Sequence, residues 1–147
     1  MSSNFIGQLK SDRQELYDVV RKYNSFLHTT NSWNCTTSLS VDEVSAIYQL
    51  TKFVPCPMGW IHPDSFRICE CLENGSVPVV KRYEGKDYFE NIFKYHPFPV
   101  VDDWSEIELL ISNYSDFEYQ ELRKKCIFYY LSQKEIISNY IYQKLKF

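Results

Sequence analysis

Long apolar runs and targeting signals are missing from this 147-residue sequence. No run of 18 apolar residues occurs, so the sequence predicts no membrane-spanning helix in this chain. The N-terminus has no basic segment followed by an apolar stretch, so we expect no cleavable secretory signal here. These absences favour a cytoplasmic protein, although residues of a longer parent chain could carry either signal.

Paired cysteine motifs and a broad positive charge are also lacking. The five cysteines are an odd number without a Cys-x-x-Cys pair, so we expect reduced, packed thiols and no bound metal. A net charge of -3 argues against nucleic-acid binding as the main role. The sequence contains no phosphate-binding Gly-x-x-x-x-Gly-Lys loop and no Asp-x-Asp metal motif. It also lacks a recognisable arrangement of Ser, His and Asp for a catalytic triad. Any positive charge that serves a ligand is therefore expected to be local.

The composition and the order of apolar segments predict a folded α/β protein. Hydrophobic residues make up 44% of the chain and aromatic residues 17%, which argues against disorder, and the length fits one domain, 1–147. Short apolar stretches alternate with helical patterns, which predicts right-handed crossovers in a parallel sheet of about five strands. The predicted strands span residues 4–7, 25–29, 52–56, 77–80 and 98–101.

Capping boxes of the form Ser-x-x-Glu or Ser-x-x-Gln predict where helices begin. Such boxes start at Ser11, Ser40, Ser115 and Ser132, and Asp103 begins a related pattern. The first box predicts a helix over about 11–23. The last two predict closing helices over about 116–131 and 134–146, which we expect to pack on their own sheet.

The stretch from Thr51 to Val80 is the most informative, because it combines a strand, a loop, a helix start and a second strand. Asp64 and Ser65 are predicted N-cap residues of this helix, which should end near Gly75. In an open parallel sheet the loop and the helix start lie at the carboxyl edge of the strands. Phosphorylated ligands bind at that edge.

Two charged residues of this helix suit a phosphorylated ligand. Arg67 and Glu70 are three residues apart and therefore share a helix face. The guanidinium of Arg67 offers bidentate donors for a diphosphate, and the carboxylate of Glu70 can accept hydrogen bonds from ribose hydroxyls. The alternative is an ordinary surface ion pair between the two, worth about 0.2–0.5 kcal/mol.

A second group of candidates follows the first strand. Gly7 ends that strand, and Lys10 and Arg13 begin the next helix, so backbone amides and two cations can meet the same phosphates as Arg67. Solvated cations are the alternative. His62, in the central loop, is a candidate contact for the sugar or the base, and a solvated histidine is again the alternative.

Aromatic and acidic residues near the same edge have two interpretations each. Trp60 and Tyr83 are candidates for stacking on a base or a sugar ring, with loop anchoring as the alternative. Asp64, Asp102 and Asp103 are the candidate catalytic bases, and helix capping explains each of them better.

The run from Cys56 to Val80, CPMGWIHPDSFRICECLENGSVPVV, resembles the donor-binding signature of exostosin-like glycosyltransferases. In that signature a Pro-x-Gly turn precedes Ser-Phe-Arg, two residues, Glu, and then Gly and x-Pro-Val. FIGQLKSDRQEL at 5–16 and PFPVVDDWSEIELLI at 97–111 resemble the first and last parts of the family's nucleotide-sugar domain. The resemblance covers nearly the whole chain, but only the central motif is specific. Met58 departs from the pattern, because many relatives carry a basic residue there.

This resemblance implies a Rossmann-like domain, the C-terminal donor half of a two-domain (GT-B type) glycosyltransferase. Such enzymes are inverting and metal-independent, and transfer a hexose or pentose from a nucleoside diphosphate sugar to an acceptor hydroxyl. Arg67 would be the catalytic residue, which neutralises the diphosphate together with Arg13, while Glu70 holds the ribose. Gly59 and Ser65 would let the backbone approach the phosphates.

The family's acceptor-binding half has no counterpart in this sequence. We therefore expect the carbohydrate or glycoconjugate acceptor and the catalytic base on an N-terminal domain or subunit outside this chain. In two-domain relatives a terminal helix often crosses to that domain. The alternatives are a stand-alone nucleotide-sugar-binding or partner-binding module without turnover and, motivated by Met58, a Rossmann-like domain that has lost the ligand.

Overall fold

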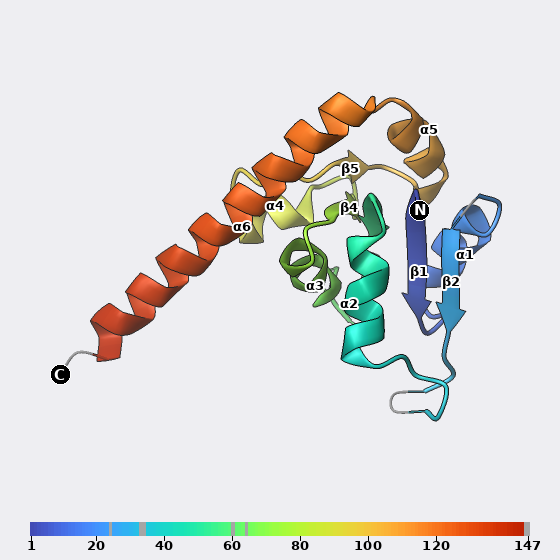
Figure 1. The fold of residues 1–147 in the computed structure, drawn as a ribbon, viewed down its shortest axis with the longest axis horizontal. Helices are drawn as coiled ribbons and strands as arrows, with labels where there is room; N and C mark the ends of the chain where they lie inside the picture. The colour runs from blue at the N-terminus through green and yellow to red at the C-terminus, as the bar shows by residue number, and fades with distance from the viewer. Residues whose placement is uncertain (24, 33–34, 60, 64, 146–147) are drawn as a thin grey trace.

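The structure, a computed structural model, describes residues 1–23, 25–32, 35–59, 61–63 and 65–145. Its strands are parallel and form two small sheets flanked by helices (Figure 1). In the first sheet β1 (Ser3–Gly7) pairs with β2 (Ser25–Thr29). In the second, β4 (Val77–Lys81) pairs with β3 (Phe53–Pro55) on one side and with β5 (Val100–Val101) on the other.

The two sheets lie next to each other through β1 and β3. The amide of Lys52 donates to the carbonyl of Met1 at 3.0 Å, and that of Phe53 to the carbonyl of Ser2 at 3.1 Å. The prediction of a parallel α/β protein is thus confirmed, and the predicted strands are found within two residues. The single sheet of about five strands is not found in the described residues. β3 is only three residues long and ends at Pro55, which has no amide hydrogen to extend a ladder.

Helices precede and follow these strands. Their bounds are α1 (Arg13–Val20), α2 (Val41–Gln49), α3 (Arg67–Glu73), α4 (Tyr88–Ile92), the 3₁₀ helix η1 (Trp104–Glu106), α5 (Ile107–Ser112) and α6 (Asp116–Leu145). The helices lie on both faces of β1. Phe5 packs edge-on against Tyr17 of α1, whereas Asn4, which points to the opposite face, donates to Thr51 just after α2.

Two of the predicted capping boxes are confirmed. At Ser40 the hydroxyl accepts from the amide of Glu43 at 3.3 Å, and the carboxylate of Glu43 accepts from the amide of Ser40 at 2.7 Å. The same reciprocal bonds join Ser115 and Glu118. Asp103 caps η1 by accepting from the amide of Ser105 at 2.8 Å.

The predictions at Ser11 and Ser132 are wrong. The backbone of Ser11 has a positive φ of 54°, its hydroxyl donates to the sulfur of Met58, and α1 begins two residues later. Ser132 lies inside α6, which runs as one helix through the two expected ones. Its hydroxyl donates to the carbonyl of Phe128 one turn earlier, and no Gly or Pro interrupts this region.

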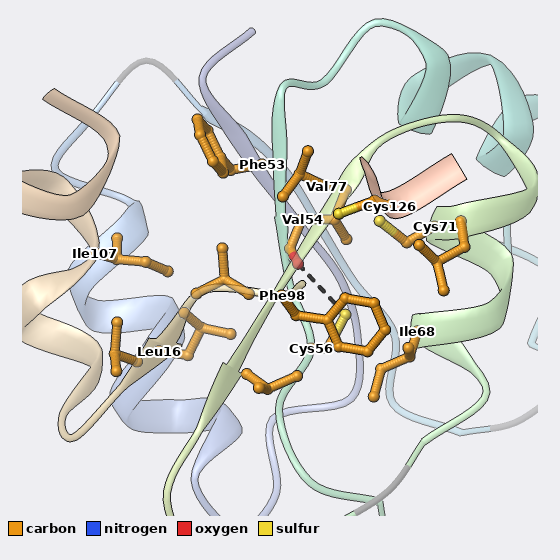
Figure 2. Packing of buried hydrophobic residues seen from close by; sticks show 14 of the residues in the cluster. Leu16, Phe53, Val54, Cys56, Ile68, Cys71, Val77, Phe98, Ile107 and Cys126 are labelled. Carbon is orange, nitrogen blue, oxygen red and sulfur yellow. Dashed lines mark hydrogen bonds between the residues drawn. The ribbon is translucent and has the colours of Figure 1, made fainter. Parts of the chain in front are cut away.

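The core lies between the strands, α1, α3, α5 and the first half of α6 (Figure 2). Cys56, Cys71 and Cys126 are fully buried in it, as expected for packed thiols, whereas Cys69 is exposed. All five cysteines are free thiols.

Only the first half of α6 packs on the body of the protein. Tyr119 and Cys126 are buried there, and Arg123 donates to the carbonyl of Gly75 at 2.5 Å. Beyond residue 133 every described side chain is exposed, and the helix extends away from the sheets (Figure 1). No helix in the described part of the chain is both long and apolar enough to cross a membrane.

Candidate functional site

The carboxyl ends of β1 and β3 bring three of the predicted site residues together. Gly7 ends β1 with a positive φ of 137°. A Cβ atom placed on Gly7 would lie 3.0 Å from a terminal nitrogen of Arg67 and 3.6 Å from one of Arg13. Glycine is therefore required here by two effects: a backbone conformation that side chains disfavour, and the close approach of two guanidinium groups.

Both guanidinium groups are oriented by backbone carbonyls. Arg67, the first residue of α3, donates to the carbonyl of Ile6 in β1. Arg13, the first residue of α1, donates through Nε to the carbonyl of Met58 at 3.1 Å. Both residues are partly buried, so their positions are fixed before any ligand arrives.

These two arginines lack a carboxylate partner within 4 Å in the described part of the chain. The pKa of Arg13 is lowered, first by burial and then by the charge of Arg67, and the adjacent Asp12 offsets this only in part. By contrast, Lys81, at the carboxyl end of β4, is paired with Glu15 at 2.9 Å. The arrangement is a concentrated positive charge suited to a multivalent anion.

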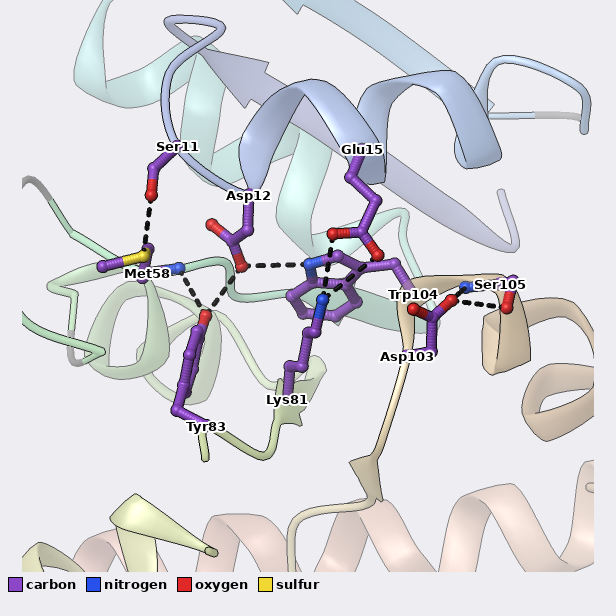
Figure 3. Close-up of polar contacts among 9 residues, drawn as sticks. All are labelled: Ser11, Asp12, Glu15, Met58, Lys81, Tyr83, Asp103, Trp104 and Ser105. Carbon is purple, nitrogen blue, oxygen red and sulfur yellow. Dashed lines mark hydrogen bonds and ion pairs between the residues drawn. The ribbon is translucent and has the colours of Figure 1, made fainter. Parts of the chain in front are cut away.

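A partly buried carboxylate, that of Asp12, joins the segments around this charge (Figure 3). Its Oδ2 accepts from the Tyr83 hydroxyl at 2.7 Å and from Nε1 of Trp104 at 3.0 Å. The Tyr83 oxygen in turn accepts from the amide of Met58 at 3.1 Å. The other carboxylate oxygen of Asp12 is buried and has no hydrogen-bond partner among the described residues. One carboxylate thus connects the start of α1 with the segments that follow β3, β4 and β5.

The remaining predicted binding residues occupy different positions around the arginines. Glu70 is exposed on α3 and forms no ion pair with Arg67, whose guanidinium points to β1 instead. The hydroxyl of Ser65 is buried and finds no partner in the part of the chain that is described, so the predicted N-cap bond is absent. The amide of Gly59 donates to the carbonyl of His62 at 2.9 Å, which uses this donor within the loop. The side chain of His62 is exposed, as is Lys10 ahead of α1.

The candidate bases and stacking residues mostly have structural partners. Asp103 caps η1, and hydrogen bonds from Ser105 lower its pKa. Asp102 pairs with Arg82 at 2.8 Å. Tyr83 anchors the loop through Met58 and Asp12. Trp60 and Asp64 lie outside the described residues.

Sequence reasoning missed Asp12 and its contact with Trp104. Asp12 follows Ser11 in an apparent capping box, so it looked like an ordinary acidic residue in a first helical turn. Its partners Tyr83 and Trp104 lie 71 and 92 residues further along the chain. The available signal was indirect: each partner closely follows a predicted strand, and such positions meet at one edge of a parallel sheet.

Comparison with known proteins agrees with the central motif. The family model described as the RXYLT1 C-terminal domain matches residues 1–146. A search of curated proteins finds no match to the chain. Because the family model spans nearly the whole chain, it includes both arginines, the loop after β3 and α6. The chain therefore belongs to the RXYLT1 C-terminal domain family, an exostosin-related family whose name points to the glycosyltransferases.

Proposed function

We propose that this domain binds the nucleoside diphosphate sugar for an inverting, exostosin-like glycosyltransferase. The observation that carries the proposal is the convergence of Arg13 and Arg67 beside Gly7, with no carboxylate partner in the described residues. Two partly buried cations at the carboxyl edge of parallel strands suit a diphosphate.

The chemistry assigned to the arginines is charge stabilisation. In an inverting transfer the acceptor oxygen bonds to the anomeric carbon while the bond from that carbon to the diphosphate oxygen breaks. The acceptor proton passes to a base, and negative charge builds on the leaving diphosphate. Arg67 is the proposed catalytic residue, and Arg13 assists it, because guanidinium groups oriented in advance need no rearrangement as that charge develops. We expect no metal requirement, since the sequence has no Asp-x-Asp motif and the two arginines supply the positive charge.

Other side chains are assigned to the rest of the donor. Glu70 is exposed on α3, three residues after Arg67, and would accept hydrogen bonds from the ribose hydroxyls. The unpartnered hydroxyl of Ser65 would donate to a phosphate oxygen. Gly59 would shape the loop rather than donate, because its amide is already used. Lys10 and His62 would contact the phosphates and the sugar or base from the exposed side.

The order of the strands supports this assignment and, with it, a Rossmann-like domain. Across both sheets, the strands follow the order β2-β1-β3-β4-β5, which is the order of one common class of doubly wound folds. In such folds ligands bind outside the carboxyl ends of the strands, where the chain order reverses. Gly7 and the loop after β3 lie at that reversal.

We further propose that the acceptor site and the base are supplied by an N-terminal domain or subunit, as in a GT-B type enzyme. The exposed second half of α6 carries Ile136, Ile137, Tyr140 and Ile141, all at least 49% exposed, and offers an apolar surface to such a partner. On this proposal the isolated chain binds the donor but transfers no sugar, and activity appears when the N-terminal half is added.

Calorimetric titration with UDP, GDP and their sugar conjugates tests the donor site. We expect micromolar binding of one nucleotide class, weakened by about 1–3 kcal/mol in Arg13→Ala and Arg67→Ala. Arg21→Ala is the matched control, since Arg21 directly follows α1 but pairs with Asp18 on the surface. Arg67→Lys keeps the positive charge at this position. Thermal unfolding of each variant then shows whether a loss of binding comes from a loss of folding. Absence of nucleotide binding by the wild-type chain would contradict the proposal.

A further inference from the structure

The backbone of Met58 is held at both of its polar atoms, the N–H and the carbonyl oxygen, by contacts that lead to the start of α1. Its N–H donates to the Tyr83 hydroxyl at 3.1 Å, and that hydroxyl donates to Asp12 at 2.7 Å. Its carbonyl accepts from Nε of Arg13 at 3.1 Å. Asp12 and Arg13 therefore fix the two peptide groups on either side of the Met58 Cα atom, in the loop after β3. Asp12 holds the first through Tyr83, and Arg13 holds the second directly.

The direction of each bond in this chain is determined. Burial, followed by the hydrogen bond to Asp12, raises the pKa of Tyr83, so its hydroxyl stays protonated at neutral pH. The single hydroxyl proton goes to the carboxylate, which leaves the oxygen to accept from the amide of Met58. Trp104 donates to the same carboxylate oxygen and holds it in place.

The carbonyl of Met58 in turn sets the plane of the Arg13 guanidinium. A guanidinium is a rigid planar fork, so one bond at Nε restricts the direction of the two terminal nitrogens. One of these lies 3.6 Å from the position of a Cβ on Gly7, and a terminal nitrogen of Arg67 lies 3.0 Å from the same position. If the backbone of Met58 turns, the terminal nitrogens of Arg13 turn with it.

We propose that Asp12 and Tyr83 are positioning residues of the donor site, which act through the backbone of Met58 to orient Arg13 toward the diphosphate. This inference rests on the proposed function, because it names residues that tune the same site without touching the nucleotide. The polar side chains around the Met58 backbone come from the start of α1 and from the segments after β4 and β5.

The first test needs no ligand. In ¹H–¹⁵N spectra of the arginine side chains, the Nε–H signal of Arg13 should be shifted and protected from exchange in the wild-type chain. Tyr83→Phe keeps the ring but removes the hydroxyl that links Met58 to Asp12. In this variant the Nε–H of Arg13 should lose most of its protection from exchange. Tyr130→Phe is the matched control. The Tyr130 hydroxyl also donates to a carboxylate distant in sequence, that of Glu73, at 2.7 Å, but this bond does not involve Met58 or Arg13. Asp12→Asn keeps an acceptor oxygen and should preserve the signal better than Asp12→Ala.

The second test is a double-mutant cycle on nucleotide affinity. Tyr83→Phe alone should weaken binding about 5–10-fold, the loss of one hydrogen-bond contribution. In an Arg13→Ala background the same change should weaken binding less than about twofold, because there is no guanidinium left to orient. A merely structural role for Tyr83 would lower the melting temperature in both backgrounds but would leave the two effects on affinity multiplicative.

The outcomes separate this inference from the proposed function. An unchanged Arg13 signal in Tyr83→Phe, or multiplicative effects on affinity, overturns the positioning role even if nucleotide binds well. A wild-type chain without nucleotide affinity overturns the donor site, and the Arg13 signal then decides alone whether Asp12 and Tyr83 orient this arginine.

Discussion

Gly7 is the residue on which the site depends most directly. Its φ of 137° is a backbone conformation that side chains disfavour. A Cβ atom on this residue would also lie only 3.0 Å from Arg67. We expect Gly7→Ala to destabilise the fold by about 1–3 kcal/mol and to abolish nucleotide binding by displacing Arg67. Gly85→Ala is the control: Gly85 also has a positive φ, 71°, but nothing lies within 4 Å of its Cβ position. Thermal unfolding and calorimetry of both variants check this, and equal effects on binding would contradict it.

Cys35 is expected to be the most reactive thiol. Hydrogen bonds from Ser38 and Thr37 lower its pKa to about 7, whereas burial raises the pKa of Cys56 and of Cys126 to about 12. A lowered pKa enlarges the thiolate fraction near neutral pH, so iodoacetamide should modify Cys35 first. The rate should rise as the pH passes about 7, and Ser38→Ala should move that rise to higher pH. Peptide mass spectrometry reads out each site, with the exposed Cys69 as internal control.

At the scale of residues, the sequence predicted the meeting of Gly7, Arg13 and Arg67, because carboxyl ends of parallel strands share an edge. It did not predict how the arginines are oriented. Arg67 bonds to a carbonyl in β1 and Arg13 to one in the loop after β3, and no local pattern encodes such distant acceptors. The contacts of Asp12 were missed for the same reason.

At the scale of elements, a capping box marks a helix start only where the chain also turns. Ser40 and Ser132 have the same Ser-x-x-Glu pattern, but Ser40 has an extended backbone with ψ of 163° and Ser132 lies within a helix. Helix α4 was missed, since five residues are too few for a periodic pattern, although Asp87 caps it. Boundaries of elements were thus harder to predict than their order.

The two serines give a paired prediction. Ser40→Ala should lower the free energy of unfolding by about 0.5–2 kcal/mol, because the amide of Glu43 loses its side-chain acceptor at the start of α2. Ser132→Ala should leave stability unchanged or slightly raised, since the serine only bonds back to its own helix. Urea unfolding measures both, and a larger loss at Ser132 would show that α6 is interrupted there in solution.

At the scale of the whole molecule, the pattern of strands and helices predicted the parallel α/β class and the strand positions. The division into two sheets could not be inferred from it. That division depends on the short β3 and on the irregular bonds between residues 1–2 and 52–53, which join the sheets without a full ladder. The prediction that the closing helices pack on their own sheet was wrong for residues 134–145 at the uncovered end of α6, which are exposed, because the apolar residues of a helix do not show what covers them.

This uncovered end leads to a prediction about association. The double variant Ile137→Ser/Ile141→Ser should keep the free energy of unfolding within about 0.5 kcal/mol of wild type, since both side chains are exposed. It should also reduce self-association at high concentration, which sedimentation measures. Ile107→Ser, at a fully buried isoleucine, is the contrasting control and should cost several kcal/mol, on the order of 2–5. A large loss of stability in the double variant would mean that this end of α6 is covered in solution.

The closeness of Arg13 and Arg67 also makes the folded state sensitive to the choice of buffer salt. The unfolded chain separates these charges, so a divalent anion such as sulfate binds the folded state preferentially and raises the melting temperature in proportion to the logarithm of its concentration. Chloride at the same ionic strength only screens the repulsion. At low millimolar concentrations this difference should vanish in Arg13→Ala. A melting curve in two salts therefore reports on the occupancy of the arginine pair before any nucleotide has been identified.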